Sequence, residues 1–253
     1  MSFDTALIVA TFILVTTVFF GLVFISSRRR KAQEEELQRA ASSRGWKFQS
    51  VREHGYRIHR WTGTTEGVAW TAESLDMISG GKHRHRRRHI ARWRGAWSSG
   101  PHQTVLFMGM PKGAEVPAFS VAQGEGFLAQ MAAKAAGYAF DLALDVYFGK
   151  DIGADVDATL MRRVNVDMPG FIVMASDVAE GERFLSEGFE RAMVDASNGK
   201  TSLPADNGRP WVLMRRQDLM LARMEKLRTI EEIGAFIQAG VALTRVPRFR
   251  ASR

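Results

Sequence analysis

The side chains best suited to bind an ion lie in one basic run that follows two glycines. This run reads Lys-His-Arg-His-Arg-Arg-Arg-His from Lys82 to His89, directly after Gly80 and Gly81. Arginine meets phosphate oxygens in a bidentate manner, and clustered cations attract the phosphates of anionic lipid headgroups or of nucleic acid. We therefore expect an anion-binding loop whose candidate residues are Lys82, Arg84, Arg86, Arg87, Arg88, Arg92 and Arg94. The alternative is a solvated loop whose charges keep a hairpin tip from pairing with other chains.

The same run offers a second chemistry, because an extended strand would place His83, His85 and His89 on one face. Three histidines can hold zinc and leave one coordination position open. However, seven cationic side chains lie between Lys82 and Arg94. No neighbouring carboxylate is evident that would orient the imidazoles, and both features oppose the binding of a divalent cation. We therefore expect no metal and no cofactor.

Other patterns that mark catalytic or metal sites are incomplete. The aspartates of residues 151–157 miss the spacing of a calcium-binding EF-hand and its final glutamate, which favours a capped turn. Gly80-Gly81-Lys82 lacks the rest of a P-loop, there is no Gly-x-Ser-x-Gly elbow, and no histidine follows His102. Glu73 is a lone acid–base candidate, for which an exposed strand position is the simpler interpretation. A hydrolase-like enzyme is therefore the alternative, and a non-enzymatic binding module is the leading interpretation.

A long apolar segment at the N-terminus predicts where such a module is held. Residues 6–26 are apolar apart from scattered hydroxyls, and no charge lies between Asp4 and Arg28. Twenty helical residues at about 1.5 Å each cover the roughly 30 Å hydrocarbon core of a bilayer, so we expect a transmembrane helix. A cleaved secretory signal is the alternative, but no basic residue precedes the apolar segment and no small-x-small site follows it.

The charges that flank this segment predict its orientation. One end is crowded by Arg28, Arg29, Arg30 and Lys31, whereas only Asp4 precedes the segment. The positive-inside rule then places the N-terminus outside and the rest of the chain in the cytoplasm. We expect a single-pass protein of the cell inner membrane. The absence of cysteine fits a reducing compartment.

Positive charge is concentrated rather than spread along the chain. The formal net charge is +8, from 35 Lys and Arg against 27 Asp and Glu. The basic residues gather at 28–31, at 82–94 and in a tail containing Arg245, Arg248, Arg250 and Arg253. Such patches favour contact with an anionic surface at chosen points over a uniformly basic nucleic-acid binder. The expected partners are the bilayer, anionic lipid headgroups or another protein, and nucleic acid stays open as a third interpretation.

The elements that must position these residues begin with a polar spacer helix that Gly45 ends. Short alternating runs then predict strands at 46–51, 56–61, 68–75, 90–97 and 104–110, which we expect to form an antiparallel meander. A nearly enclosed helix over 127–148 is expected to pack against this sheet.

The last hundred residues alternate strands and helices. We expect strands at 160–166 and 170–175, then a helix from Ser176 or Asp177 to about residue 195, with Phe184, Leu185, Phe189 and Met193 on its inner face. Residues 211–215 and 219–224 should pair as a hairpin. Thr229 and Glu232 form the capping box of a final helix over 230–243.

The sequence thus predicts an α+β fold: a single N-terminal transmembrane helix followed by a cytoplasmic domain of antiparallel strands with packed helices. We expect the anchor at 1–27, a basic juxtamembrane segment and spacer helix at 28–45, a strand-rich subdomain with a buried helix at 46–150, and an α+β subdomain with a basic tail at 151–253. Whether the last two are separate domains, and the oligomeric state, stay open.

This plan resembles a broad set of uncharacterised bacterial membrane-anchored proteins. The resemblance rests on the Arg-rich segment after one apolar span, on Gly45-Trp46-Lys47-Phe48, and on Gly-Phe-Ile-Val-Met-Ala-Ser-Asp at 170–177 followed by Pro-Trp-Val-Leu at 210–213. It implies the architecture of one membrane span and a cytoplasmic α+β domain, and it implies no activity or catalytic residues.

Overall fold

The computed structural model describes residues 3–53, 55–77, 89–97, 105–109, 144, 148–149, 156–157, 160–165, 171–185, 188–189, 191–193, 211–215 and 217–245, with side chains described from Val15 onward and without that of Phe107. The chain forms two compact units, Met1–Phe48 and Gln49–Arg253.

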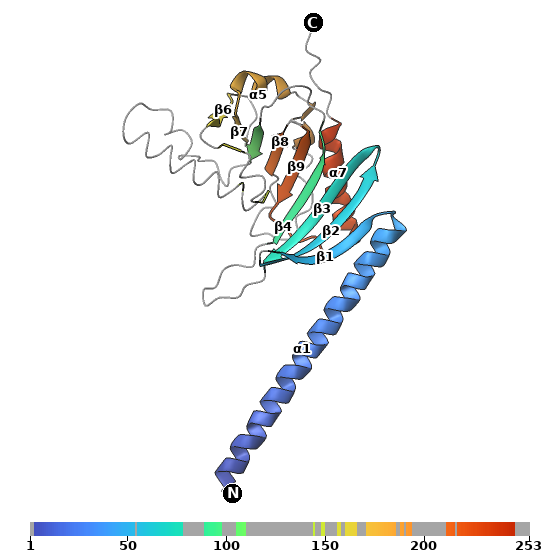
Figure 1. The fold of residues 1–253 in the computed structure, drawn as a ribbon, viewed down its shortest axis with the longest axis vertical. Helices are drawn as coiled ribbons and strands as arrows, with labels where there is room; N and C mark the ends of the chain where they lie inside the picture. Colours follow the sequence, from blue (N-terminus) through green and yellow to red (C-terminus); the bar gives the residue numbers. More distant parts are fainter. Residues whose placement is uncertain are drawn as a thin grey trace, which may run out of the picture. The chain divides into compact units, whose positions relative to one another are not determined.

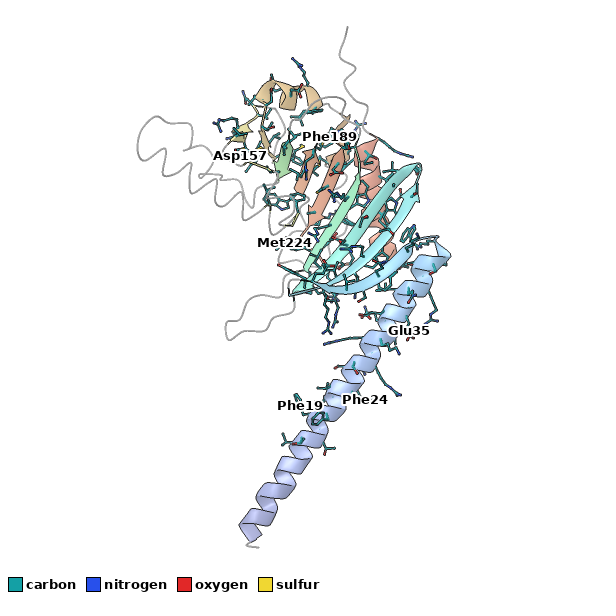
Figure 2. The ribbon with its side chains drawn as sticks, viewed as in Figure 1. Phe19, Phe24, Glu35, Asp157, Phe189 and Met224 are labelled. Carbon is teal, nitrogen blue, oxygen red and sulfur yellow. The ribbon has the colours of Figure 1, made fainter. Side chains whose placement is uncertain are left out.

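The first unit consists of one helix, α1 (Phe3–Ser43), and the first two residues of the strand that follows it. The apolar segment and the polar spacer, expected as two elements, are therefore one continuous helix. It ends where the sequence predicts, because Gly45 adopts a left-handed φ of 73° and Trp46 N donates to Ala41 O at 2.9 Å. Phe19 and Phe24 project outward from its apolar half (Figure 2).

The exposed large apolar side chains of this half are Val15, Val18, Phe19, Phe20, Leu22, Val23, Phe24 and Ile25. Among the helices that the structure describes, none is both long enough and apolar enough to cross a membrane.

The second unit is built on a nine-stranded sheet in the order β1-β2-β3-β4-β9-β8-β5-β7-β6. Its strands are β1 (Lys47–Glu53), β2 (Tyr56–Thr65), β3 (Val68–Met77), β4 (His89–Ala96), β5 (Leu106–Gly109), β6 (Arg162–Arg163), β7 (Ile172–Ala175), β8 (Trp211–Arg215) and β9 (Asp218–Arg223). Every described pairing is antiparallel, which confirms the α+β class and the antiparallel sheet.

The meander is confirmed for the first four strands and wrong for the fifth. The hairpin of β8 and β9, which the sequence predicts, lies between β4 and β5. Eight of the eleven residues of these two strands are buried, and strands apolar on both faces belong in the middle of a sheet. The subdomains expected at 46–150 and 151–253 therefore contribute strands to one shared sheet.

One face of the sheet is covered by α7 (Ile230–Thr244), which lies along β3, β4 and β9 (Figure 1). Trp93 of β4 is only 1% exposed and lies between two glycines. A Cβ atom added to Gly240 of α7 would approach its ring to 2.2 Å, and one added to Gly95 would do the same. Helix and sheet therefore meet this closely only because both positions lack a side chain. The capping box that starts α7 is confirmed, since Thr229 and Glu232 bond reciprocally.

The same face continues to α5 (Val178–Phe184), whose N-cap is Asp177 as expected. A Cβ added to Gly181 would lie 2.8 Å from the Cβ of Ala175 on β7. The expected continuous helix to residue 195 is wrong, because Leu185 is extended and ends α5. Helical backbone recurs at 188–189 and 191–193, where Phe189 and Met193 are buried as predicted.

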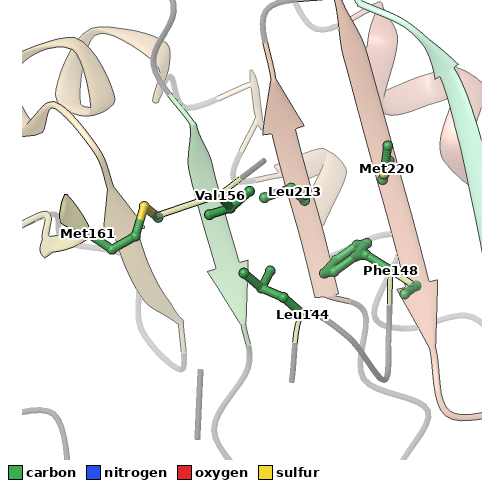
Figure 3. Close-up of a cluster of buried hydrophobic side chains, with 7 residues drawn as sticks. Leu144, Phe148, Val156, Met161, Leu213 and Met220 are labelled. Atoms are coloured by element: carbon green, nitrogen blue, oxygen red, sulfur yellow. The ribbon is translucent and has the colours of Figure 1, made fainter. Parts of the chain in front are cut away.

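The opposite face carries a second apolar cluster, shown in Figure 3. Its buried members are Leu144, Phe148, Val156, Met161, Leu213, Met220 and Ala222. The helix expected over 127–148 lies outside the described residues except for its end, where Leu144 is helical and Gly149 has a φ of 99°. That end packs against the sheet, as predicted. Of the strand expected at 160–166, β6 is the described part.

Candidate functional site

The basic loop joins two paired strands, and its stems can be examined directly. β3 ends at Met77 and β4 begins at His89, so residues 78–88 connect neighbouring antiparallel strands. The following candidates lie outside the described residues: Lys82, His83, Arg84, His85, Arg86, Arg87 and Arg88. The site is therefore built from the stems, which hold His89, Arg92 and Arg94.

Arg92 and Arg94, both expected to bind anions, are bound to carboxylates of the fold. Arg92 Nη2 donates to Glu73 Oε2 at 2.7 Å, and its Nη1 donates to the carbonyl of Phe148 at 3.1 Å. Arg94 Nη2 donates to Asp218 Oδ2 at 2.9 Å. The side chain of Arg92 is 20% exposed and that of Arg94 is 55% exposed. Arg92 is therefore a structural residue, and Arg94 already has an anionic partner.

Glu73 is not the exposed strand residue that the sequence suggested. Its side chain is 13% exposed, and each of its two carboxylate oxygens accepts a hydrogen bond from a different arginine. Arg60 Nε of β2 donates to Oε1 at 2.7 Å, while Arg92 of β4 occupies Oε2. The hydrogen bond to Glu73 is the largest contribution that raises the pKa of Arg60. Both oxygens of this carboxylate are thus occupied by arginines of the neighbouring strands, which gives Glu73 a structural role in the sheet.

The base of the loop is closed by Asp76, which directly faces His89 in the strand register. Asp76 Oδ1 lies 2.6 Å from His89 Nδ1, and its Oδ2 accepts from Lys226 Nζ at 2.9 Å. Lys226 belongs to the connection between β9 and α7. One carboxylate therefore links both stems of the loop to the segment that leads into α7.

Burial of Asp76 acts to raise the pKa of its carboxyl. Hydrogen bonds to Lys226 and His89, together with the positive charge of these groups, outweigh burial and lower that pKa. Asp76 also supplies what the sequence analysis found missing for a metal, a carboxylate on an imidazole. Among the described residues, however, no three histidine, aspartate or glutamate side chains gather as a metal site.

A buried ion pair lies beyond this cluster and was missed from the sequence. Arg223 Nη1 donates to Glu225 Oε1 at 3.1 Å, with both side chains almost fully enclosed. The Arg223 guanidinium is 5.9 Å from the centre of the Phe236 ring on α7. Burial raises the pKa of Glu225, against the opposing effect of Arg223. Because both side chains are buried next to α7, we interpret this pair as a structural contact.

The remaining candidate residues also fall into those with a partner in the fold, those outside the described residues and those that are exposed. Arg245 of the basic tail pairs with Glu66, and Arg248, Arg250 and Arg253 lie outside the described residues. Of the three aspartates considered for calcium, only Asp157 is described, and it is exposed. By contrast, Arg28, Arg29, Arg30 and Lys31 are all exposed on α1.

Comparison with known proteins finds no protein family, no curated protein and no solved structure that matches this chain. The resemblance to membrane-anchored bacterial proteins therefore stays a prediction.

The contacts of Glu73 with Arg60 and Arg92 predict that loss of this carboxylate lowers the stability of the fold, independently of any binding role. Replacing Glu73 with Gln leaves Arg92 without its carboxylate and Arg60 with only Glu53 at 4.0 Å, which should lower the free energy of unfolding by about 2 kcal/mol. The matched control is Asp218→Asn, which removes the carboxylate from the more exposed pair with Arg94 and should cost less than about 1 kcal/mol. Chemical denaturation of both full-length variants measures the difference. Equal effects would show that Glu73 does not hold the strands together.

The contacts of Asp76 with His89 and Lys226 predict a loss of stability in acid. A carboxyl whose folded pKa is lowered contributes stability above its ordinary pKa of about 3.9 and loses it as the pH falls through the folded value. The stability difference between the wild type and Asp76→Asn should therefore persist down to about pH 5 and close below about pH 4. Melting temperatures across this range measure it.

Glu225→Gln is the control with the opposite sign. Because the folded pKa of Glu225 is raised, its ionisation costs stability as the pH rises above its ordinary value of about 4.3. The wild type should therefore lose stability relative to this variant between that pH and neutrality. A parallel response of the two variants would contradict the assignment of Asp76.

Proposed function

We propose that this protein is a non-enzymatic binding module, tethered to the cell inner membrane by α1 with its sheet domain in the cytoplasm, that contacts an anionic surface through its basic loop. The observation that carries the tether is the run of eight large apolar side chains exposed between Val15 and Ile25. Exposed apolar clusters of this size mark membrane or protein contacts. The sequence extends the run to Ala6, ahead of the described side chains.

The orientation is proposed from charge. Four consecutive cations, Arg28–Lys31, follow the apolar segment, and Asp4 is the only charge before it. This asymmetry favours a cytoplasmic body.

The contact is proposed for a smaller set of residues than the sequence suggested. Arg92 and Arg94 are engaged by Glu73 and Asp218, so the proposal is confined to the cations of the connecting segment: Lys82, Arg84, Arg86, Arg87 and Arg88. Support comes from Asp76, which ties both ends of this segment to the sheet and so presents it from a fixed base. Anionic lipid is favoured over nucleic acid because a tether holds the loop near a surface rich in such lipid.

The orientation predicts the behaviour of C-terminal fusions. A fusion of the full chain to alkaline phosphatase should be inactive, because this enzyme needs an oxidising compartment for its disulfides. A fusion to a fluorescent protein that folds in the cytoplasm should be bright. Active phosphatase with a dark fluorescent fusion would place the body outside and overturn the cytoplasmic assignment.

The loop predicts salt-dependent binding to acidic vesicles. The full chain, embedded in nanodiscs of neutral lipid, should capture separate acidic vesicles more strongly than neutral ones, and less as salt rises. Changing Arg84, Arg86, Arg87 and Arg88 to Gln should remove about 1 kcal/mol per residue from this binding, and the melting temperature should hardly change.

The matched control removes the same charge elsewhere, by changing the exposed residues Arg52, Arg94, Arg162 and Arg163 to Gln. It should keep most of the vesicle binding. Equal losses in both variants would mean that net charge, and not the loop, causes the capture. Binding of single-stranded DNA in the same salt series, without a response to lipid, would favour nucleic acid as the partner.

A further inference from the structure

The polar half of α1 carries its charges in two bands that are separated along the helix axis. Arg28–Lys31 form the first band, directly after the apolar segment, and Glu34–Glu36 form the second. Successive helical residues are about 100° apart, so four in a row surround the helix. The acidic band begins six residues after Arg28 and ends eight after it, which is about 9–12 Å along the axis.

The first band is available to an outside partner. Arg28, Arg29 and Arg30 are exposed and have no carboxylate partner among the described residues. Lys31 Nζ is 4.0 Å from the Glu35 carboxylate, with both side chains mostly in solvent, which is a weak pair. The Arg28 guanidinium lies 4.9 Å from the centre of the Phe24 ring, so this cation is held back toward the apolar segment.

The polar side chains at the boundary between the apolar segment and this band form hydrogen bonds within the helix. The hydroxyl of Ser26 donates to the Val23 carbonyl and that of Ser27 to the Phe24 carbonyl, both at 2.8 Å. Neither side chain therefore brings an unpaired donor to the edge of a lipid phase. The helix continues through this boundary without a break to Ser43.

We propose that Arg28–Lys31 form a collar that binds anionic phospholipid headgroups, and that the acidic band keeps the rest of α1 upright, as a strut pointing away from the membrane. This inference rests on the proposed tether. If residues 28–43 lay flat on the surface, Glu34–Glu36 would meet the same anionic headgroups as the arginines. In the upright arrangement they stand about 9–12 Å beyond Arg28 and about 4.5–7.5 Å beyond Lys31, so distance and a Debye length of about 8 Å both weaken their repulsion from the headgroups. Leu37 is the only large apolar residue in the sequence of 28–43, and it is already buried, so little apolar surface is left for a surface-lying helix to bury in lipid.

The chain suits a direct test, because it contains no cysteine and single cysteines can be introduced without background. Exposed positions along the strut are Ala32, Gln33, Glu36, Gln38 and Ser42. Each cysteine variant is labelled with a fluorophore in the full chain and reconstituted in vesicles of mixed neutral and anionic lipid that carry a headgroup quencher. An upright strut gives quenching that falls steadily from Ala32 to Ser42, at about 1.5 Å of added distance per residue. Quenching that recurs about every 3.6 residues without a decline would show a helix lying on the surface and overturn the strut.

A cysteine at Phe20 separates this failure from a failure of the tether. With a quencher on the lipid chains, a label at Phe20 should be quenched strongly if α1 is inserted. No quenching there would overturn the proposed tether itself, whereas quenching at Phe20 with a periodic pattern beyond Ala32 would overturn only the strut.

The collar is tested by the lipid that surrounds the protein. Energy transfer from the labelled chain to a fluorescent anionic lipid should exceed that to a neutral lipid. Changing Arg28, Arg29 and Arg30 to Gln should lower this preference by about fivefold per charge. Arg39, Arg44 and Arg52, changed together to Gln, form the matched control and should leave it nearly intact. Equal preference in the wild type and the collar variant would show that the collar binds no anionic lipid.

Discussion

The carboxylate of Glu73 ties the central part of the sheet together. It lies on β3 and binds Arg60 on β2 and Arg92 on β4, and Arg92 also reaches the carbonyl of Phe148. Half-buried cations are costly unless a counter-charge completes their hydrogen bonds. The register of these three strands therefore also determines whether their arginines are neutralised. A shift of one residue would turn Glu73 to the other face of the sheet and leave both guanidinium groups without this carboxylate.

The two faces of the sheet are packed in different ways. On the α7 face, Trp93 fills the space between helix and strand, and Gly95 and Gly240 make room for it. The same face also encloses the Arg223–Glu225 pair, and at the base of the loop it carries the partly exposed contacts of Asp76 with His89 and Lys226. On the opposite face, apolar residues around Leu213 and Met220 pack beside the charged ladder of Arg60, Glu73 and Arg92. Arg60, Arg92 and Arg223 are thus each held beside a carboxylate.

This pairing separates the cations that build the fold from those left for a partner. Arg60, Arg92, Arg223 and Arg245 have carboxylate partners, and Arg94 has one at the surface. Arg28–Arg30 have none among the described residues. A count of basic residues in the sequence overstates the positive surface that an anionic membrane would meet. For this reason the functional proposals depend on the helix collar and the residues between the loop stems.

The sequence by itself determined the features that depend on neighbours in the chain. Gly45 ends α1, Asp177 and Thr229 cap their helices, and residues 211–223 form a hairpin, because each needs only local backbone geometry or a short turn. Glu73 and Asp76 are three residues apart on β3, and their partners Arg92 and His89 are three residues apart on β4, but this matching spacing does not by itself fix the register of the two strands. Only the tertiary structure decided that β8 and β9 insert beside β4, that Glu73 is enclosed, and that Arg92 is structural. These outcomes depend on contacts between distant residues and on which faces become buried, and neither local propensity nor the period of a strand contains that information.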